Sequence, residues 1–281
     1  MRDITITRVL QAQTRHYLAV VGLAALTLGI PPAQSQEIIP GDIFPNMAGI
    51  GIGFTPEFSG AKDNIVGAAP GLRYQLSGNR FVEWWGPLAD INLLDSPTWQ
   101  AGPMISYRFG RSDVKDPVVN LLPEIDGTWE GGAFASYTYL NTNGIPWRIR
   151  LGVSGVTDLG SEYNGLSTTV FGSIWMPLSH TVFVGLGGGA VYGSTSFMQT
   201  YYGVSTAGAG ASGLAPYSPE GGLRNYFLWP AVIWQFDKNW AMGGMLFYQR
   251  LTGDAADSPI VRERGTVHQL TGGVGIGYIW K

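Results

Sequence analysis

From residue 46 onward, apolar residues repeatedly alternate with glycine or polar residues. Successive side chains of a β-strand point to opposite faces, so this period of two predicts strands with one apolar face. The clearest alternations open and close the region, at Ala48, Ile50, Ile52 and Phe54 and again at Val274, Ile276, Tyr278 and Trp280. The pattern predicts twelve strands, at 46–58, 68–76, 79–85, 88–95, 98–109, 129–140, 146–156, 165–177, 180–193, 224–236, 239–251 and 267–280.

The segments that connect these strands are alternately short and long. Short connections lie at 77–78, 96–97, 141–145, 178–179 and 237–238, and long ones at 59–67, 110–128, 157–164, 194–223 and 252–266. Only the dipeptide Gly86-Pro87 breaks the alternation. Short turns at one end and long loops at the other are typical of outer-membrane barrels, whose short turns face the periplasm. We therefore expect an all-β transmembrane antiparallel barrel of about twelve strands, or of ten if residues 79–95 form one irregular piece.

Composition separates this barrel from a soluble β-sandwich. Only 13% of the residues are charged, 41 are glycine, and the polar strand positions hold mainly Gly, Ser and Thr. A soluble sheet would carry abundant Lys and Glu on its outer face, whereas a lipid-facing barrel needs an apolar exterior and small interior residues. The net charge of −3 gives no reason to expect a nucleic-acid partner, and the absence of cysteine excludes disulfides.

The first 35 residues have the features of a signal peptide. Arginines precede a 14-residue apolar run at 17–30, which is too short to cross a bilayer, and a small-residue cleavage site then ends at Ser35. We expect cleavage there, a periplasmic N-terminal stretch at 36–45 and a barrel at 46–281. Export and the barrel pattern together predict the outer membrane of a Gram-negative bacterium, in contact with its lipid.

Charged residues of the strands should point into the lumen. An arginine on the lipid face near the bilayer centre costs on the order of 2–4 kcal/mol, which favours the inward orientation. The candidate lumen-lining residues are Arg73, Arg108, Glu130, Arg148 and Arg150. They could make a pore that prefers anions, or they could pair with Glu83 and Glu130 into a charge network that fills the lumen. The sequence leaves both outcomes open.

Two long loops hold further candidate residues. Residues 112–128 are too apolar for a free loop in water, so we expect them to fold into the barrel mouth or to form a patch that faces a partner. Residues 194–223 carry Tyr201 and Tyr202, and tyrosines on a flexible loop can contact a sugar or a protein. Packing of this loop as a cap over the barrel is the interpretation we favour.

The chain offers few residues for catalysis. After signal cleavage the only histidines are His180, which we expect in a solvated turn, and His268. A Ser/His/Asp set made from Ser258, His268, Asp254 and Asp257 would need the loop to fold back over the last strand. Asp and Ser in such a segment are more typical of a turn-rich loop, because their side chains bond to nearby backbone. We therefore predict no catalytic site, no metal site and no cofactor.

Several motifs resemble the MipA/OmpV family of outer-membrane proteins (MltA-interacting protein and relatives). The most specific is Arg-Leu-Thr-Gly-Asp-Ala-Ala-Asp-Ser-Pro-Ile-Val at 250–261, which is similar to the family's loop before its last strand. Residues 197–204 and 212–214 are similar to its long central loop, and the segments 102–103, 107–111 and 130–134 resemble the family in the same order. Tyr278 and Trp280 resemble the terminal aromatic signal of such barrels, although Lys281 is a departure from it.

The resemblance covers most of residues 40–281 and implies an outer-membrane barrel. It also implies a scaffold that joins a murein transglycosylase to a murein synthase in the periplasm, while other relatives are associated with pore-like, osmotic or drug-permeation behaviour. No set of functional residues is established for the family, so none is carried over. Our first hypothesis is therefore a non-enzymatic scaffold, the alternative is a small channel for solutes or drugs, and an outer-membrane hydrolase that uses Ser258 and His268 is the third.

Overall fold

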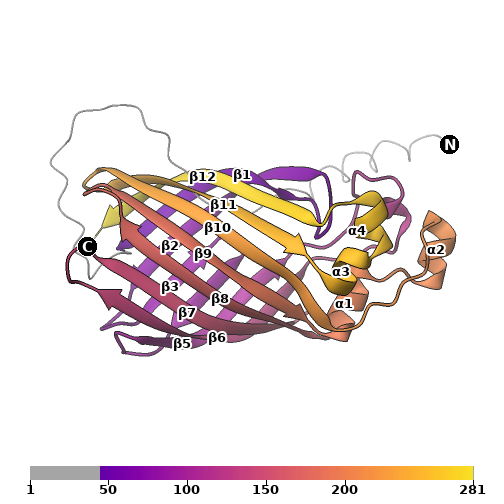
Figure 1. Ribbon diagram of the computed structural model, residues 1–281, viewed down its shortest axis with the longest axis horizontal. Coiled ribbons are helices and arrows are strands. Elements are labelled where there is room, and N and C mark those ends of the chain that lie inside the picture. Colours follow the sequence, from indigo (N-terminus) through magenta and orange to yellow (C-terminus); the bar gives the residue numbers. More distant parts are fainter. Residues whose placement is uncertain (1–44, 281) are drawn as a thin grey trace, which may run out of the picture.

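Twelve antiparallel strands close into a barrel in the computed structural model, which describes residues 45–280 (Figure 1). The predicted signal peptide at 1–35 lies outside the described residues, as does the stretch at 36–45 except for its last residue. The strands are β1 (Asn46–Pro56), β2 (Asn64–Gln75), β3 (Phe81–Trp85), β4 (Leu88–Asn92), β5 (Trp99–Arg108), β6 (Thr128–Asn141), β7 (Trp147–Asp158), β8 (Leu166–Pro177), β9 (Val182–Gly193), β10 (Gly222–Asp237), β11 (Trp240–Leu251) and β12 (His268–Trp280).

Each strand pairs with its neighbours in the sequence, and β1 pairs with β12 to close the sheet. The prediction of a twelve-stranded antiparallel barrel is confirmed, and the ten-stranded alternative is wrong. β3 and β4 are separate strands because Gly86, at a φ of 59°, takes the first position of a two-residue hairpin turn. That left-handed conformation favours glycine, which has no Cβ to clash with the backbone.

The outer face of the barrel is apolar. Ile52, Val66 and Val170 expose 60%, 69% and 60% of their surface and all point outward. Aromatic side chains are exposed near both ends of the strands, with Tyr74, Trp99, Tyr137, Tyr139, Trp240 and Tyr278 toward the short turns and Trp129, Tyr192 and Tyr226 toward the long loops. An apolar band between two aromatic girdles is the surface that a barrel presents to a bilayer.

Glycines on the inner face make room for large rings in the lumen. A Cβ on Gly187 would lie 2.2 Å from the indole of Trp229, and one on Gly185 would lie 2.6 Å from the indole of Trp175. Both distances are well inside van der Waals contact, so any larger residue at these positions would displace an indole. Gly185 and Gly187, in the glycine-rich run of β9, are therefore strand positions whose paired residues on the neighbouring strands are tryptophans.

The β3–β4 hairpin is much shorter than the strands beside it. β2 pairs with β3 only over residues 71–75, so its other half, from Asn64 to Ala69, pairs with β1 alone. The sequence pattern placed the start of β2 at 68, four residues late. At the loop end of β2, beyond the short hairpin, Lys115 contacts the start of this strand. Its Nζ donates to the Asn64 carbonyl oxygen at 2.7 Å, and its backbone N–H donates to Glu57 at 3.1 Å.

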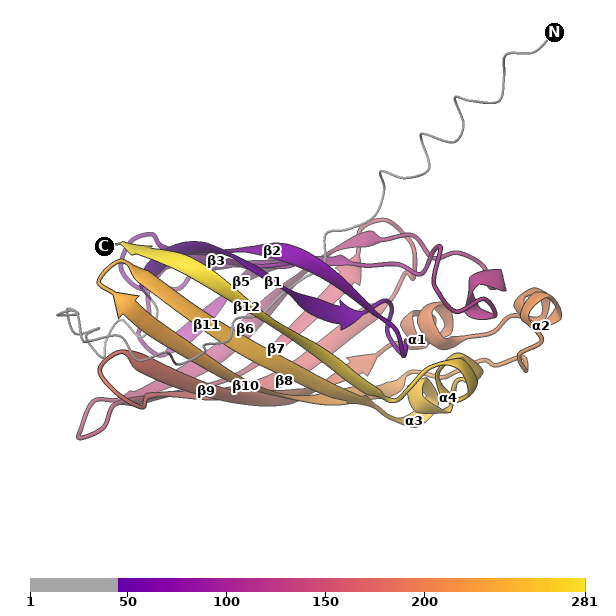
Figure 2. The same ribbon diagram turned by 90° about the horizontal axis from the view of Figure 1, so that it is seen from above.

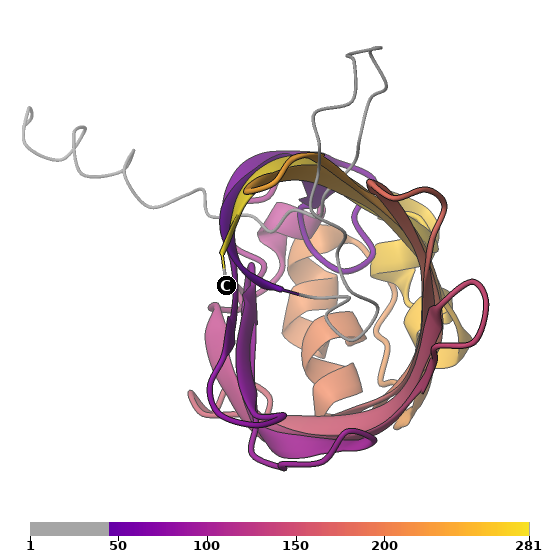
Figure 3. The ribbon, with the colours of Figure 1, turned by 90° about the vertical axis from the view of Figure 1, so that its left-hand side faces the viewer.

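The long connections fold into a cap of short helices at one end of the barrel (Figures 1 and 2). They contain the 3₁₀ turn η2 (Val119–Leu121) and the helices α1 (Thr195–Tyr202), α2 (Thr206–Ser212), α3 (Gly253–Asp257) and α4 (Pro259–Arg264). Seen along the barrel from the end with the short turns, helices lie across the far mouth (Figure 3). None of the helices in the described part of the chain is long and apolar enough to cross a membrane.

Candidate functional site

A cavity of about 850 Å³ runs through the barrel. Its lining begins at Met47 and Ile233, near the short turns, and reaches Phe58 and Tyr202 beneath the cap. The volume lies within the roughly 300–1,000 Å³ range of small-molecule sites. The lumen is therefore hollow along its length and covered at one end, which makes its charged wall the candidate functional site.

One wall of the lumen carries a row of charged side chains on β2, β3 and β4. Arg73 faces Glu83 in the register of β2 and β3, and Glu83 faces Asp90 in the register of β3 and β4. The Arg73 guanidinium donates to a Glu83 carboxylate oxygen at 3.1 Å and lies 4.2 Å from the centre of the Phe81 ring. The predicted pairing of an inward arginine with Glu83 is thus present, on the half of the barrel nearer the short turns.

Two arginines of β7 face the same part of the lumen from another wall. Arg148 and Arg150 both line the cavity, and Arg150 donates from Nε to the Ser136 hydroxyl at 3.0 Å. They lie close enough to the first wall for Arg150 to interact electrostatically with Asp90 and for Arg148 to interact with Glu83. The two guanidiniums of β7 thus face a wall that carries Glu83 and Asp90 beside Arg73, which sets up a field across the lumen at this level.

A second charged cluster lies under the cap, around Glu130 of β6. Its carboxylate accepts hydrogen bonds from Arg108 Nε at 2.6 Å, the Ser106 hydroxyl at 2.7 Å and the Tyr163 hydroxyl at 2.8 Å. Glu130 is 3% exposed, so this is a buried ion pair with its acceptor oxygens satisfied. Burial, reinforced by the neighbouring Glu130 carboxylate, raises the pKa of Tyr163, which keeps the phenol protonated as a donor.

Helix α1 closes the lumen above this cluster. The Phe197 ring lies 4.8 Å from the Arg108 guanidinium and 5.5 Å from that of Arg224. Phe197 and Met198 are 1% and 0% exposed, and they pack with Tyr163, Tyr201 and Tyr202 in one apolar cluster. Aromatic faces over two guanidiniums are favourable cation–π contacts. The outer mouth is therefore covered by helix α1, which contacts the strand residues Arg108 and Arg224.

The predicted loop-contact residues lie within the cap. Tyr201 and Tyr202 are 8% and 0% exposed, and the Tyr202 hydroxyl shares a hydrogen bond of 2.6 Å with the Ser59 hydroxyl. The Ser258 hydroxyl is fully buried and donates to the Tyr202 carbonyl oxygen at 2.7 Å. Asp254 accepts the backbone N–H of Glu220 at 2.7 Å, and Asp257 ends α3. These residues pack the cap, whose helices α1, α3 and α4 lie in segments for which the sequence pattern predicts only connecting loops.

The residues of the hydrolase hypothesis have separate partners. His268 shares a hydrogen bond of 2.7 Å with the Tyr248 hydroxyl on the outer side of the barrel, whereas Ser258 points into the cap. Among the residues that the structure describes, no hydrogen bond joins the two. His180 stands in the turn between β8 and β9, as expected. In residues 45–280, no three His, Cys, Asp or Glu side chains gather into a possible metal site.

Sequence reasoning missed three charged or polar residues in and beside the lumen, Arg224, Asp90 and Tyr163, and one of the cap, Asp116, which pairs with Lys62 and Arg264. Arg224 was assigned to a strand, but it sits at a bulge between Leu223 and Asn225 that breaks the simple alternation. The inward position of Asp90 follows from strand parity once the β3–β4 turn is placed. Tyr163 and Asp116 lie in loops, where no periodic signal announces their burial.

Comparison with solved structures finds barrels of low sequence identity. The NanC porin is 7% identical, with a TM-score of 0.45, over 83% of this chain and 100% of that chain. The translocator domain of the autotransporter NalP from Neisseria meningitidis is 12% identical, with a TM-score of 0.39, over 84% and 88%. The CymD monoaromatic hydrocarbon channel is 9% identical, with a TM-score of 0.39, over 86% and 91%.

Comparison of the sequence with families gives a more specific result. No curated protein matches the chain. The model of the family described as MltA-interacting protein MipA, however, matches residues 48–280, which run from the third residue of β1 to the end of β12. The match agrees with the resemblance found in the loop motifs. The chain therefore belongs to the MipA family of outer-membrane barrel proteins.

Proposed function

We propose that this protein is a gated channel for small solutes in the outer membrane of a Gram-negative bacterium. The observation that supports this most directly is the hollow lumen, with a cavity of about 850 Å³ that extends from the short turns to the underside of the cap. A barrel that only bound partners through its turns and loops would have no use for a hollow, charged interior. Filling the interior with apolar side chains would cost less than burying ion pairs in it.

The charge arrangement supports selectivity for anions. Arg73 is neutralised by Glu83, and Arg108 by Glu130, through direct ion pairs. Arg148 and Arg150 are adjacent inward positions on one strand and both line the passage. At this level three guanidiniums, of Arg73, Arg148 and Arg150, face two carboxylates, of Glu83 and Asp90, and the excess of cations favours anions. The ion pairs therefore narrow the lumen without filling it.

The cap supports gating at the outer mouth. α1 covers the lumen through one cluster of aromatic and apolar side chains and through the contacts of Phe197 with two arginines. Loops that occlude a barrel mouth open on the microsecond-to-second timescale of lid motions. The closed arrangement described above is then the resting state, and solute passage requires α1 to leave the mouth.

Single-channel recording of the refolded protein in a planar bilayer tests this proposal. We expect brief conductance steps with a preference for anions, and we expect that preference to fall in a variant carrying Arg148→Gln and Arg150→Gln. Arg262→Gln, whose exposed side chain lies on α4, is the matched control and should leave the preference unchanged. A silent bilayer, from protein whose heat-dependent gel migration shows an intact barrel, would refute the channel.

A scaffold role is the second candidate, because the family is described as MltA-interacting protein. The short turns supply a specific observation in its favour, since Leu93, Ile145 and Leu178 expose 55%, 71% and 73% of their surface there. Exposed apolar residues on one rim are a possible contact for a partner such as a murein transglycosylase or a murein synthase. Site-specific cross-linking from position 178 in cells should capture such an enzyme, and Ile145→Ser in the same protein should abolish the product. Cross-links to lipid alone would contradict the scaffold.

We infer that the protein is not an enzyme. The support is the arrangement of Ser258, which is buried under Tyr202, and of His268, which bonds to Tyr248. Nucleophile and base must lie within hydrogen-bond reach of each other for acyl transfer. Assays of the purified barrel with ester and phospholipid substrates should give no turnover. Turnover that disappears in Ser258→Ala would overturn this inference.

A further inference from the structure

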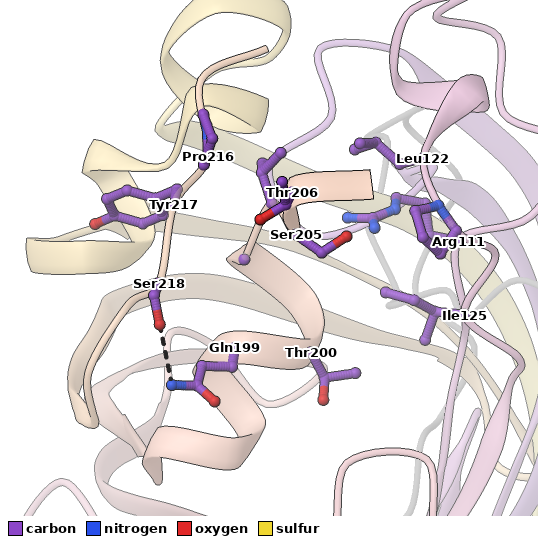
Figure 4. Close-up of a pocket in the computed structure, with 13 residues that line it drawn as sticks. Arg111, Leu122, Ile125, Gln199, Thr200, Ser205, Thr206, Pro216, Tyr217 and Ser218 are labelled. Atoms are coloured by element: carbon purple, nitrogen blue, oxygen red, sulfur yellow. Dashed lines mark hydrogen bonds between the residues drawn. The ribbon is translucent and has the colours of Figure 1, made fainter. Parts of the chain in front are cut away.

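A second cavity, of about 510 Å³, lies in the outer part of the cap (Figure 4). It is bounded by α1, the start of α2, the loop at 122–125 and the segment at 216–218. Hydroxyl and amide groups line much of it, from Gln199, Thr200, Ser205, Thr206 and Ser218, and the amide of Gln199 donates to the Ser218 hydroxyl at 3.3 Å. Such a lining can exchange hydrogen bonds with the hydroxyls of a ligand.

Arg111 is the single charged residue in the lining of this pocket. It is held by backbone hydrogen bonds to Ile125 at 2.8 and 3.1 Å and is 6% exposed. Its Nη1 donates to the Tyr201 carbonyl oxygen at 3.2 Å, and its Nε is buried without a hydrogen-bond partner. In Figure 4 the guanidinium extends toward Ser205 and Thr206.

The surroundings of Arg111 leave its charge uncompensated. No carboxylate is among the residues that line the pocket, and no ion pair of Arg111 occurs within the described range 45–280. Burial lowers its pKa to about 10, so the side chain is still a cation at neutral pH. Burying a cation without a partner costs several kcal/mol, and an anion that bonds to it recovers part of that cost.

We propose that this pocket binds a small hydroxylated anion of the acidic-monosaccharide class, with Arg111 as the partner of its carboxylate and the hydroxyl-rich lining as the partner of its ring hydroxyls. This site goes beyond the proposed channel, because ligand binding in the outer pocket does not require the lumen to conduct. It also lies next to the passage, since Arg111 and Ile125 line both cavities. A ligand on Arg111 would compete with the Tyr201 carbonyl for the guanidinium, at the point where α1 ends.

Calorimetric titration of the refolded full-length barrel in detergent provides the first test. The probes are sodium glucuronate, glucose as the neutral analogue of the same shape, and inorganic phosphate as an anion without a sugar ring. Glucuronate should bind at least about tenfold more tightly than either of the others, a difference that one charge-assisted contact can supply. If glucose bound as tightly as glucuronate, the proposed role of the Arg111 charge would be wrong. If phosphate bound as tightly as glucuronate, the proposed role of the hydroxyl-rich lining would be wrong.

Variants then test the assignment to this pocket. Arg111→Gln should weaken glucuronate binding at least about tenfold, and the exposed Arg262→Gln should not change it. Thr206→Asp places a carboxylate where Figure 4 shows the guanidinium pointing, and aspartate is favourable at the first position of a helix, so α2 should persist. This variant should also abolish binding, while Ala207→Asp, which adds the same charge at an exposed position of α2 outside the lining, should retain it.

A folding control distinguishes a variant that does not fold from a variant that folds but does not bind the ligand. Each variant is first shown to be folded by its heat-dependent gel migration, and only folded variants are titrated. Binding that survives both Arg111→Gln and Thr206→Asp would place the ligand elsewhere and overturn the proposal, as would the absence of glucuronate binding to the unmodified protein. Either result leaves the channel proposal untouched, because conduction is measured separately.

Discussion

Asp116 joins three loops of the cap, and replacing it with asparagine should loosen all three. Its carboxylate accepts two hydrogen bonds from Arg264 on α4, at 3.1 and 3.0 Å, and one from Lys62 at 3.3 Å. It also accepts the backbone N–H groups of Val118 and Val119 at the η2 turn, at 3.0 and 3.1 Å. Asp116→Asn keeps the shape of the side chain, removes its charge and replaces one acceptor oxygen with a donor NH2 group, so the charge is lost together with the hydrogen bonds that this oxygen accepts.

The pKa of Asp116 gives the size of the stabilisation that the charged carboxylate provides. Burial alone would raise this pKa, but the hydrogen bonds from Arg264, Val119, Val118 and Lys62 outweigh it and lower the pKa from 3.8 to about 2. One unit corresponds to about 1.4 kcal/mol, so the charge stabilises the closed cap by roughly 2 kcal/mol. The side chain is 5% exposed, which limits screening by solvent. The population with this network open should then rise roughly thirtyfold in Asp116→Asn.

Native-state hydrogen exchange measures this opening at the amides of Val118 and Val119. At pH 7 both amides should exchange roughly thirtyfold faster in Asp116→Asn, after correction for intrinsic rates. Because folding lowers the pKa, the stabilisation is complete above about pH 4 and is lost as the pH falls toward about 2. The difference between the two proteins should therefore shrink over that window. Glu263→Gln, on the exposed side of α4, is the matched control.

Two outcomes would refute this reasoning. If the two proteins were equally protected at pH 7, the charge would contribute nothing to the closed cap. If the difference persisted unchanged at pH 2, it would come from altered packing and not from the ionised carboxylate. In bilayer recordings the same variant should spend more time open, because the Arg264 and Lys62 contacts no longer hold the loops together.

Further predictions concern the buried ion pair and the glycines. Glu130→Gln leaves Arg108 buried without its carboxylate and should destabilise the barrel by about 3–5 kcal/mol, seen as a lower midpoint in urea unfolding; an unchanged midpoint would mean that water compensates the arginine. Gly132→Ala should prevent refolding, judged by loss of the heat-modifiable gel band, because its Cβ would lie 1.9 Å from the Gly155 carbonyl oxygen. Gly210→Ala, in open space on α2, should refold normally and slow exchange of the α2 amides by a factor that corresponds to at most about 1 kcal/mol.

The barrel could be predicted from the sequence because its signal is repeated. Each strand alternates one lipid-facing side with one small-residue side, and twelve repetitions compensate for weak segments. The error at the start of β2 arose where the pattern itself is weak, since residues 67–69 are Gly-Ala-Ala and Pro70 follows. Small residues on both faces give no alternation to read, although their backbone still pairs with β1.

The cap could not be predicted in the same way, although part of its signal was present. Phe197, Met198, Tyr201 and Tyr202 follow the spacing of one helical face, and Ser194 precedes them as the N-cap, accepting the Phe197 N–H. The sequence analysis favours a loop that packs as a cap but does not use this spacing to predict the helix. The burial of Arg111 and Asp116 leaves no trace in the sequence, because it depends on loops far apart in the chain meeting over the barrel mouth.

The seam between β1 and β12 determines when this fold can exist during biosynthesis. Asn46 pairs with Trp280 and Phe54 with Gly272, so the sheet closes only when the last strand meets the first. Until β12 has been synthesised and delivered, any partial sheet carries two open edges, which readily pair with other chains. A chain truncated before β12 therefore yields an open sheet and not a smaller barrel. Secretion must therefore keep this polypeptide unfolded until every strand has been delivered. The pairing of β1 with β12 joins residues that are far apart in the sequence, and such contacts form slowly.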